Sequence, residues 1–249
     1  YTLWGGYYPG AYYPSRVNAY MPAQNEAAQI PVPVFRMLGS DPIYQYDTGI
    51  GGSWQQVESL EPVYPHSGGD AEWIRYFFGS MADDPALGLT YAQVGQENSF
   101  TWPAMAEGLK EQFAVIDSLN TAKRIRVETL TESARRYREQ YPVTAPTATS
   151  TLRDIRGEGH RTVWFNSRFY RVNMLWEDGA MRLRDIHMFD ERLKSNYFEQ
   201  AGTSTQCVYH TLPVMDGFNW STTDKLAGVY LCERLDGGIR TIPCGDPVM

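Results

Sequence analysis

Strand-like and helix-like segments alternate through the first 143 residues, and this alternation restricts the possible folds most. Short apolar runs at 30–38, 89–96 and 124–130 predict strands, and segments 70–81, 102–119 and 131–142 have the spacing and end signals of helices. Such a repeat is typical of a parallel sheet covered by helices. Three units cannot close a barrel of about eight strands. We therefore expect the C-terminal part of a (β/α) barrel.

The pattern changes after a Pro- and Thr-rich linker, "PVTAPTATST" (142–151). Apolar residues then recur at every second position, and the segments 162–176 and 180–189 flank "EDG", a common hairpin turn. The sequence thus predicts an α/β fold in two domains. Residues 1–143 would form the partial barrel, and residues 144–249 an antiparallel, β-sandwich-like domain.

Composition favours a neutral ligand with polar edges. The net charge of −7 argues against nucleic acid, because phosphate binding needs a concentrated basic surface. No apolar run approaches the ~20 residues that span a bilayer. Aromatic residues make up 14% of the chain, and their flat apolar rings suit the faces of sugars. We expect Trp4, Tyr12 and Tyr13 in the aromatic N-terminal segment to contact a carbohydrate, although such segments are also found as packed loops.

Each predicted strand of the first half ends near a carboxylate. Asp41 follows the first strand, Glu97 ends the second in "GQEN", and Glu128 lies near the end of the third. Ligands of parallel α/β folds bind at these strand ends. Each residue alone also fits a structural role, such as an ion pair between Glu128 and Arg126 or a charge near a helix N-terminus.

Three carboxylates at one rim would suit the hydrolysis of a glycosidic bond. One carboxylic acid protonates the leaving oxygen, and a second carboxylate attacks the sugar or activates water. Glu97 precedes Phe100 and Trp102, and an aromatic, partly dry site raises the pKa of an acid. We therefore predict Glu97 as the acid, with Asp41 and Glu128 as alternatives for nucleophile or base.

Three further residues are predicted to bind substrate. Asn98 can hold a sugar hydroxyl and Trp102 can stack on a ring. His66 lies in the connection 39–69, which is long enough to be functional.

The sequence predicts no metal or other cofactor. The four histidines, His66, His160, His187 and His210, show no metal-binding spacing. In "RDIHMFDE", strand alternation places Asp185 and His187 on one face, where they form a buried supporting pair or reach the barrel rim.

The cysteines and the first residue bear on location. Cys232 and Cys244 flank a predicted hairpin, where a turn centred on Gly238 would place them opposite each other; Cys207 is left over. A disulfide would suit a secreted or periplasmic protein. The sequence begins at Tyr1 rather than Met, so a removed export signal or an upstream part of the same protein is expected, and the latter would be a partner of this chain.

Three segments carry a resemblance to a known family. "WGGYYPGAYYPSRVN…IPVPVFRMLGSDPIYQYD", "VGQENSFTWP" and "VWFNSRFYRVNMLWEDGAMRLRDIHMFDE" resemble bacterial proteins of the glycoside hydrolase/deacetylase barrel superfamily, many of them uncharacterised proteins of gut bacteria. The resemblance implies a (β/α) barrel followed by a β domain, and an enzyme that acts on polysaccharides. The early strands that carry the metal ligands of deacetylases have no counterpart here.

Three functions therefore stay open. The first is a glycoside hydrolase-like enzyme, the second a metal-dependent polysaccharide deacetylase, and the third a carbohydrate-binding protein without catalysis.

Overall fold

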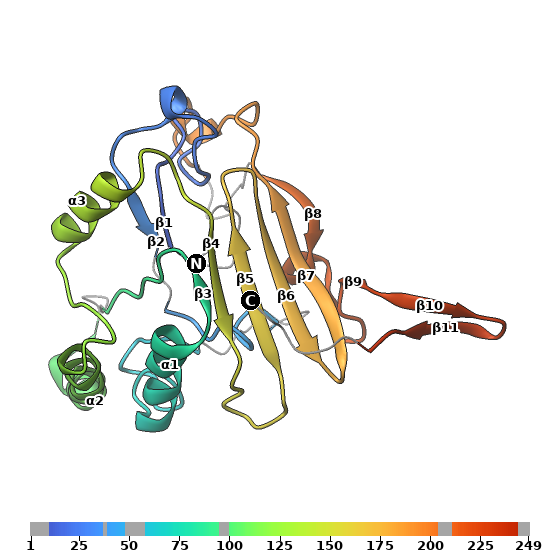
Figure 1. The fold of residues 1–249 in the computed structure, drawn as a ribbon, viewed down its shortest axis with the longest axis horizontal. Coiled ribbons are helices and arrows are strands. Elements are labelled where there is room, and N and C mark those ends of the chain that lie inside the picture. The colour runs from blue at the N-terminus through green and yellow to red at the C-terminus, as the bar shows by residue number, and fades with distance from the viewer. Residues whose placement is uncertain (1–9, 37–38, 48–57, 95–99, 204–210, 244–249) are drawn as a thin grey trace.

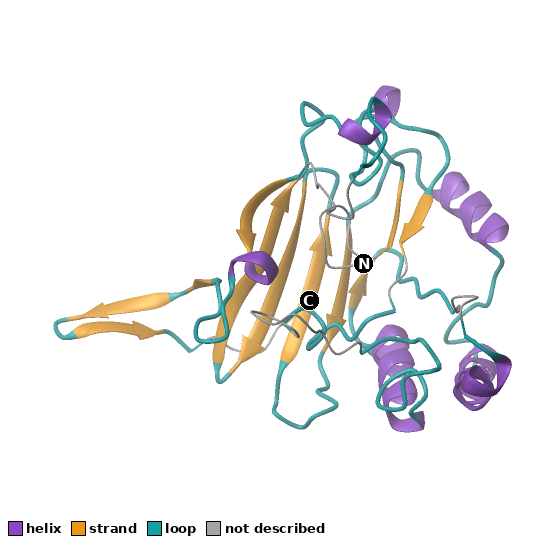
Figure 2. Ribbon diagram, turned by 180° about the vertical axis from the view of Figure 1, so that it is seen from behind, coloured by secondary structure: helices purple, strands orange, loops and turns teal. Residues whose placement is uncertain are grey.

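The computed structural model describes residues 10–36, 39–47, 58–94, 100–203 and 211–243. A twisted antiparallel sheet forms the centre, and the three longer helices lie beyond its β3 edge (Figure 1). A two-stranded hairpin projects from the opposite side, as the view from behind also shows (Figure 2). None of the helices in the described ranges is long and apolar enough to cross a membrane.

The large sheet runs in the order β3-β4-β5-β6-β7-β8, and β9 pairs with another part of β7. Each of these pairs is antiparallel. The strands are β3 (Ala86–Leu87), β4 (Thr147–Thr151), β5 (Arg161–Asn166), β6 (Tyr170–Glu177), β7 (Ala180–Met188), β8 (Leu212–Asp216) and β9 (Val229–Tyr230). The predicted antiparallel pairing of the second half is thus confirmed, whereas a β-sandwich-like arrangement is not shown, since β4 to β9 belong to one sheet. The Pro- and Thr-rich linker contributes a strand of this sheet.

The hairpin of β6 and β7 follows from local sequence. Burial alternates along β6, so one face of the strand packs inward while the other stays more open. The turn residues Asp178 and Gly179 have φ angles of 51° and 74°, as tight two-residue hairpin turns require. Residues 162–176 were expected as one strand, but a turn at Ser167, whose N–H donates to the Tyr170 carbonyl at 2.8 Å, divides them into β5 and β6.

The predicted helices are confirmed with small shifts at their ends. They are α1 (Ala71–Asp83), α2 (Trp102–Thr121) and α3 (Leu130–Gln140), together with a short α4 (Gly217–Trp220) and the 3-10 turns η1 (Glu26–Ala28) and η2 (Asn196–Phe198). Asp70 caps α1 by accepting the Trp73 N–H at 2.8 Å, and Pro103 occupies the first turn of α2. Thr129 caps α3 in a reciprocal capping box with Glu132.

The three predicted parallel strands of the first half are wrong. Within 30–38, β2 (Val34–Arg36) is antiparallel to β1 (Gly10–Tyr12). The described residues of the other two segments, 89–94 and 124–130, form no strand. Ala92, Val94 and Ile125 instead pack against the main core cluster, so burial rather than a hydrogen-bonded ladder explains their apolar pattern. The structure is therefore a mixed α/β fold with antiparallel sheets, and a (β/α) barrel is not shown.

The projecting hairpin consists of β10 (Cys232–Leu235) and β11 (Gly238–Thr241). Its register pairs Cys232 with Thr241, three positions before Cys244. The expectation that Cys232 lies opposite Cys244 in the ladder is therefore wrong, because Thr241 occupies the position opposite Cys232. Cys244 itself lies outside the described residues.

The main core cluster combines residues from both sides of the predicted domain boundary. Trp73, Tyr76 and Phe77 of α1 lie in it with Tyr46 of the first half and Trp164 of β5. Tyr46 and Trp164 have ring centroids 5.7 Å apart. The division into residues 1–143 and 144–249 stays a prediction, and any such domains share this core.

Buried charge lies on one part of the sheet. Arg171 of β6 and Arg182, Arg184 and Asp185 of β7 are each 0% exposed. Arg171 binds Asp185 with two hydrogen bonds of 2.8 Å. Charges as buried as these remain ionised only when they are paired, so this layer requires partners from the chain that covers it.

Candidate functional site

The segment 41–47 covers the buried arginines and is held by them. Arg184 donates to the carbonyl oxygens of Pro42 and Ile43 at 2.9 and 2.7 Å and to the Asp47 carboxylate at 2.7 Å. Arg182 donates to the same Asp47 carboxylate at 2.7 Å. The sheet therefore fixes the position of this segment, including Asp41.

Asp41 organises the turn that follows it. Its Oδ1 accepts the N–H groups of Ile43 and Tyr44 at 2.8 and 2.9 Å, and its own N–H donates to the Glu58 carbonyl at 2.7 Å. Asp41 is 1% exposed. Burial raises its pKa to about 6, assisted by the charge of Glu58 and opposed by the two backbone hydrogen bonds.

A group of buried polar atoms surrounds the other oxygen of Asp41. Asp41 Oδ2, Trp73 Nε1 and the Tyr76 hydroxyl are buried without a hydrogen-bond partner in the described part of the chain. The three side chains face one another closely enough to affect the ionisation of Asp41 and Tyr76. Burial, followed by the charge of Asp41, also raises the pKa of Tyr76. The Trp73 Nε1–H can only donate a hydrogen bond, the Tyr76 hydroxyl can donate or accept, and Asp41 Oδ2 accepts when ionised and would donate only when it carries the proton.

A small cleft of about 190 Å³, here called the Glu58 cleft, adjoins this buried group. Its lining residues come from the long connection, the start of α1 and the segment after β4: Glu58, His66, Asp70, Glu72, Trp73, Ile155 and Arg156. Glu58 forms an ion pair with Arg156, and Trp73 supplies an aromatic wall. The cleft therefore combines carboxylates, an exposed imidazole and an aromatic ring.

Tight packing holds the loop on one side of this cleft. A Cβ on Gly68 would lie 2.4 Å from the Glu61 oxygen, which explains why glycine occupies this position. Gln112 of α2 is 0% exposed and donates to the carbonyl oxygens of Leu60 and Gly68 at 2.7 Å each. These contacts position His66 and the Asp70 cap.

The opposite side of the cleft is built around Asp154. Its carboxylate accepts the backbone N–H groups of Arg156, Glu158 and His160 at 2.8, 3.0 and 3.0 Å. The Tyr44 hydroxyl lies 2.8 Å from both Asp154 oxygens. Burial opposes ionisation of Asp154, but these hydrogen bonds keep its pKa below the ordinary value.

Arg156 connects the two sides. Its guanidinium lies 3.7 Å from the centroid of the Tyr44 ring and also pairs with Glu58. Tyr44 is thus held by Arg156 over its face and by Asp154 at its hydroxyl. This arrangement restrains Glu58, which is 7% exposed.

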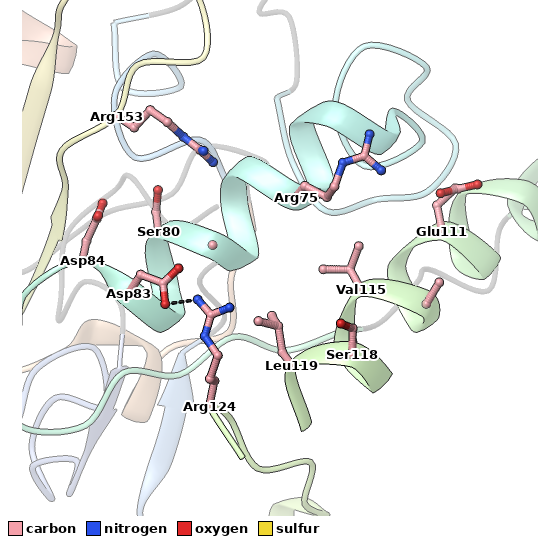
Figure 3. A pocket seen from close by; sticks show the side chains of 12 residues that line it. Arg75, Ser80, Asp83, Asp84, Glu111, Val115, Ser118, Leu119, Arg124 and Arg153 are labelled. Carbon is pink, nitrogen blue, oxygen red and sulfur yellow. Dashed lines mark hydrogen bonds and ion pairs between the residues drawn. The ribbon is translucent and has the colours of Figure 1, made fainter. Parts of the chain in front are cut away.

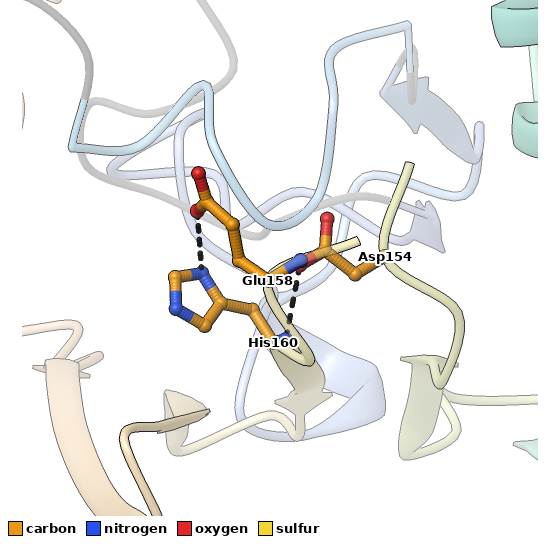
Figure 4. Close-up of side chains that lie close together, drawn as sticks. All are labelled: Asp154, Glu158 and His160. Carbon is orange, nitrogen blue, oxygen red and sulfur yellow. Dashed lines mark hydrogen bonds and ion pairs between the residues drawn. The ribbon is translucent and has the colours of Figure 1, made fainter. Parts of the chain in front are cut away.

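Asp154, Glu158 and His160 could hold a cation. One ligand atom from each lies within 4.8 Å of the other two. Figure 4 shows the imidazole of His160 beside the Glu158 carboxylate and the Asp154 carboxylate at the backbone N–H of His160. Carboxylate oxygen and imidazole nitrogen suit several divalent ions. The same carboxylates already interact with the Tyr44 hydroxyl, the His160 ring and backbone N–H groups, so the cluster also has a structural explanation.

Of the predicted catalytic residues, Asp41 lies next to this cleft. Glu128 instead accepts a hydrogen bond from the Ser133 hydroxyl at 3.1 Å and forms an ion pair with Arg136 of α3. An ion pair was one of the structural roles considered for Glu128, but with Arg126 as the partner. Glu97 lies outside the described residues. Among the described residues, Glu128 does not line the Glu58 cleft, and the catalytic roles of all three carboxylates stay predictions.

The predicted substrate-binding residues occupy different surroundings. His66 lines the Glu58 cleft, and Trp102 is 62% exposed at the start of α2. Tyr12 and Tyr13 are 2% and 3% exposed, and their hydroxyls donate to the carbonyls of Ala19 and Tyr141 at 2.7 Å each. These contacts give both tyrosines a packing role. Trp4 and Asn98 lie outside the described residues.

Asp185 and His187 form the expected buried pair. His187 Nε2 lies 3.7 Å from Oδ2 of Asp185 and 3.7 Å from Oδ2 of Asp216. Burial, followed by the charge of Arg171, lowers the pKa of His187. A neutral imidazole at this position supports the sheet.

Glu58, Tyr44, Asp154 and Arg156 were missed from the sequence. The available signal was the length of the connection 39–69, which contains two of them. Asp154 and Arg156 lie in a segment without a recognisable motif, and only the folded sheet brings them to Glu58.

No known protein-family model matches this chain, and no curated protein is similar to it in sequence. One similar solved structure is that of a protein proposed to be a glycoside hydrolase/deacetylase, from Parabacteroides distasonis. The two share 15% sequence identity with a TM-score of 0.59, over 90% of this chain and 52% of the other. The chain thus spans about half the length of that protein, with which it shares a fold.

Proposed function

We propose that this protein is a glycoside hydrolase-like enzyme that cleaves a polysaccharide or oligosaccharide at the Glu58 cleft. The observation that carries the proposal is the raised pKa of Asp41, about 6, directly behind a second carboxylate that lines a cleft. Glycosidic cleavage uses two carboxyl groups whose surroundings separate their protonation. The description of the Parabacteroides distasonis protein as a glycoside hydrolase/deacetylase agrees with this chemistry.

The proposed roles follow from position. Glu58, held by Arg156, faces the cleft and acts as nucleophile or base. His66 and Trp73 border the cleft and would contact the sugar, with Trp102 as a more distant contact. The acid is either Asp41, which needs a local opening because it is 1% exposed, or Glu97. A secreted or periplasmic location belongs to the same proposal, because polysaccharides are met outside the cytoplasm.

Turnover of two substrate classes tests these roles. We expect Glu58→Gln to slow both an activated aryl glycoside and a natural oligosaccharide by roughly 10²–10⁴-fold. A variant of the acid, Asp41→Asn or Glu97→Gln, should slow the oligosaccharide more, since an aryl leaving group needs no proton. Glu233→Gln on the projecting hairpin serves as the control. Unchanged turnover of both substrates by Glu58→Gln, with a folded protein, would refute the assignment.

A metal-dependent polysaccharide deacetylase is the alternative, and one observation favours it. Asp154, Glu158 and His160 offer three ligand atoms close together, and a bound divalent ion would supply the Lewis acid that such a reaction needs. Equilibrium dialysis with Zn²⁺ or Mn²⁺ tests this alternative. Tight binding that His160→Ala abolishes, together with release of acetate from an acetylated glycan, would favour deacetylation over glycosidic cleavage.

A non-catalytic carbohydrate-binding protein is the third proposal. It predicts binding of an oligosaccharide without release of a reducing end or of acetate.

A further inference from the structure

A second and larger pocket lies between α1, α2 and the segment after β4, with a volume of about 520 Å³. Figure 3 shows its side chains, with Arg153 and Arg75 above the opening and Leu119 and Val115 below. It shares no lining residue with the Glu58 cleft. We call it the α1–α2 pocket.

Arg153 is held at the edge of this pocket by α1. Its guanidinium lies 5.8 Å from the centroid of the Tyr76 ring. A Cβ on Gly79 would lie 3.6 Å from Arg153 Nη2, an ordinary van der Waals distance, so the guanidinium lies directly beside the helix surface at this position. The ring and the helix therefore orient Arg153 while its N–H groups remain available toward the pocket.

Two of the three arginines that line this pocket have no acidic partner. Arg124 pairs with Asp83, whereas Arg75 and Arg153 form neither an ion pair nor a hydrogen bond with the described residues. Both are exposed. The formal charge of the lining is balanced, because Asp83, Asp84 and Glu111 offset the three arginines. An anion site here therefore depends on the two guanidinium groups that have no acidic partner.

The carboxylates of the pocket are less available than its arginines. Asp83 is occupied by Arg124, and Asp84 accepts the backbone N–H of Leu152 at 2.8 Å. Glu111 lies on the α2 side. A ligand anion in this pocket would therefore find the guanidinium groups of Arg75 and Arg153 free to donate hydrogen bonds.

The lower wall of the pocket is apolar. Val115 is half-buried and Leu119 is 8% exposed, and both face the space below the arginines (Figure 3). An apolar wall opposite a few polar groups is typical of small-molecule sites. It suits the C–H face of a ring that carries a charged substituent at its edge.

We propose that the α1–α2 pocket binds the oxyanion of a small ligand, a carboxylate or sulfate group carried by a sugar ring. Arg153 and Arg75 would hold the anion through paired N–H donors, and Val115 and Leu119 would contact the ring. The site is separate from the proposed catalytic cleft, so it does not depend on the enzyme's activity.

Calorimetric titration with glucuronate, glucose 6-sulfate and glucose tests the proposal. At low salt we expect at least one of the charged sugars to bind about tenfold more tightly than glucose, and 0.3 M NaCl to weaken that binding. Tighter binding of glucuronate would identify a carboxylate, and tighter binding of glucose 6-sulfate would identify a sulfate. Equal affinity for glucose and both charged sugars, or no binding of any of them, would overturn the proposal.

Variants locate the site. Arg75→Gln with Arg153→Gln should weaken binding of the charged sugar about tenfold or more, and Arg234→Gln, an exposed arginine of the projecting hairpin, should not. Gly79→Leu keeps both arginines but displaces Arg153 from the helix surface, so it should weaken binding even if the double variant fails to fold. Full affinity in Gly79→Leu and in the double variant would place the anion elsewhere and refute the pocket.

Discussion

Arg184 of β7 donates a hydrogen bond to Asp47 across 2.7 Å, although 137 positions separate the two residues in the sequence. The same guanidinium binds the carbonyl groups of Pro42 and Ile43. The segment that follows Asp41 is therefore held by a residue that is distant in the sequence and does not line the cleft.

Replacing Arg184 should destabilise the fold strongly. Arg184→Met leaves the two carbonyl groups without their donor and removes one of the two guanidinium groups that pair with Asp47. We therefore expect a loss of about 3–5 kcal/mol in the free energy of unfolding. Urea denaturation measures this loss. The matched control is Arg135→Met, whose partner Glu139 is 63% exposed, and which should change stability by no more than about 0.5 kcal/mol. Similar losses for both variants would contradict the role of Arg184.

Stability should fall between pH 4 and pH 6 because of Asp41. Its pKa is raised from 3.8 to about 6 in the folded chain, so the folded state keeps its proton where the unfolded state has lost it. Each unit by which the pKa is raised corresponds to about 1.4 kcal/mol. The contribution of Asp41 to the free energy of unfolding is therefore about 3 kcal/mol; it is present below pH 4 and is lost as the pH rises through 6. Unfolding curves at several pH values measure it.

Asp41→Asn provides the control for this pH dependence. The amide keeps an oxygen for the N–H groups of Ile43 and Tyr44 but does not titrate. The difference in stability between the variant and the original protein should therefore change between pH 4 and pH 6. A difference that stays constant over this range would show that Asp41 titrates normally.

Gly68→Ala should be costly. The added Cβ would lie 2.4 Å from the Glu61 oxygen, so the loop that carries His66 must move, and overpacking of this kind typically costs about 1–3 kcal/mol. Gly237→Ala is the control, because nothing lies within 4 Å of its Cβ position. Thermal unfolding of both variants tests the difference, and equal melting temperatures would mean that the loop adapts freely.

Cys232 should react with a thiol reagent in the native protein. It is exposed and free in the structure, and its ladder partner is Thr241. Mass spectrometry after labelling should find the label on Cys232, and Cys232→Ser should remove it. A label on Cys232 that appears only after reduction would instead support the disulfide predicted from the sequence.

The helices were predictable because their signals are local. Asp70 before α1 and Pro103 in the first turn of α2 act on neighbouring backbone groups, so a short window contains the information. The hairpin turn at Asp178 and Gly179 is equally local. These elements agree with the sequence to within a few residues.

The prediction of a parallel sheet was wrong because the pairing of strands depends on residues far apart in the sequence. Residues 89–94 have the composition of a strand, but half-burial against other elements satisfies that pattern without a ladder. The candidate site shows the same limit. Asp41 and His66 could be selected from the sequence, whereas Glu58 and Arg156 meet across 98 positions and have no motif in common.

The buried arginines of β7 also set an order of events in folding. Segment 41–47 has its strongest partners between 135 and 142 positions later in the chain. Contacts of such long range form slowly, because a large loop must close first. During synthesis, the ribosome must therefore release the β6–β7 hairpin before the segment that carries Asp41 can settle. A fragment that ends at residue 143 would keep Asp47 without either arginine, and we expect it to be a substrate for chaperones and proteases rather than an independent domain.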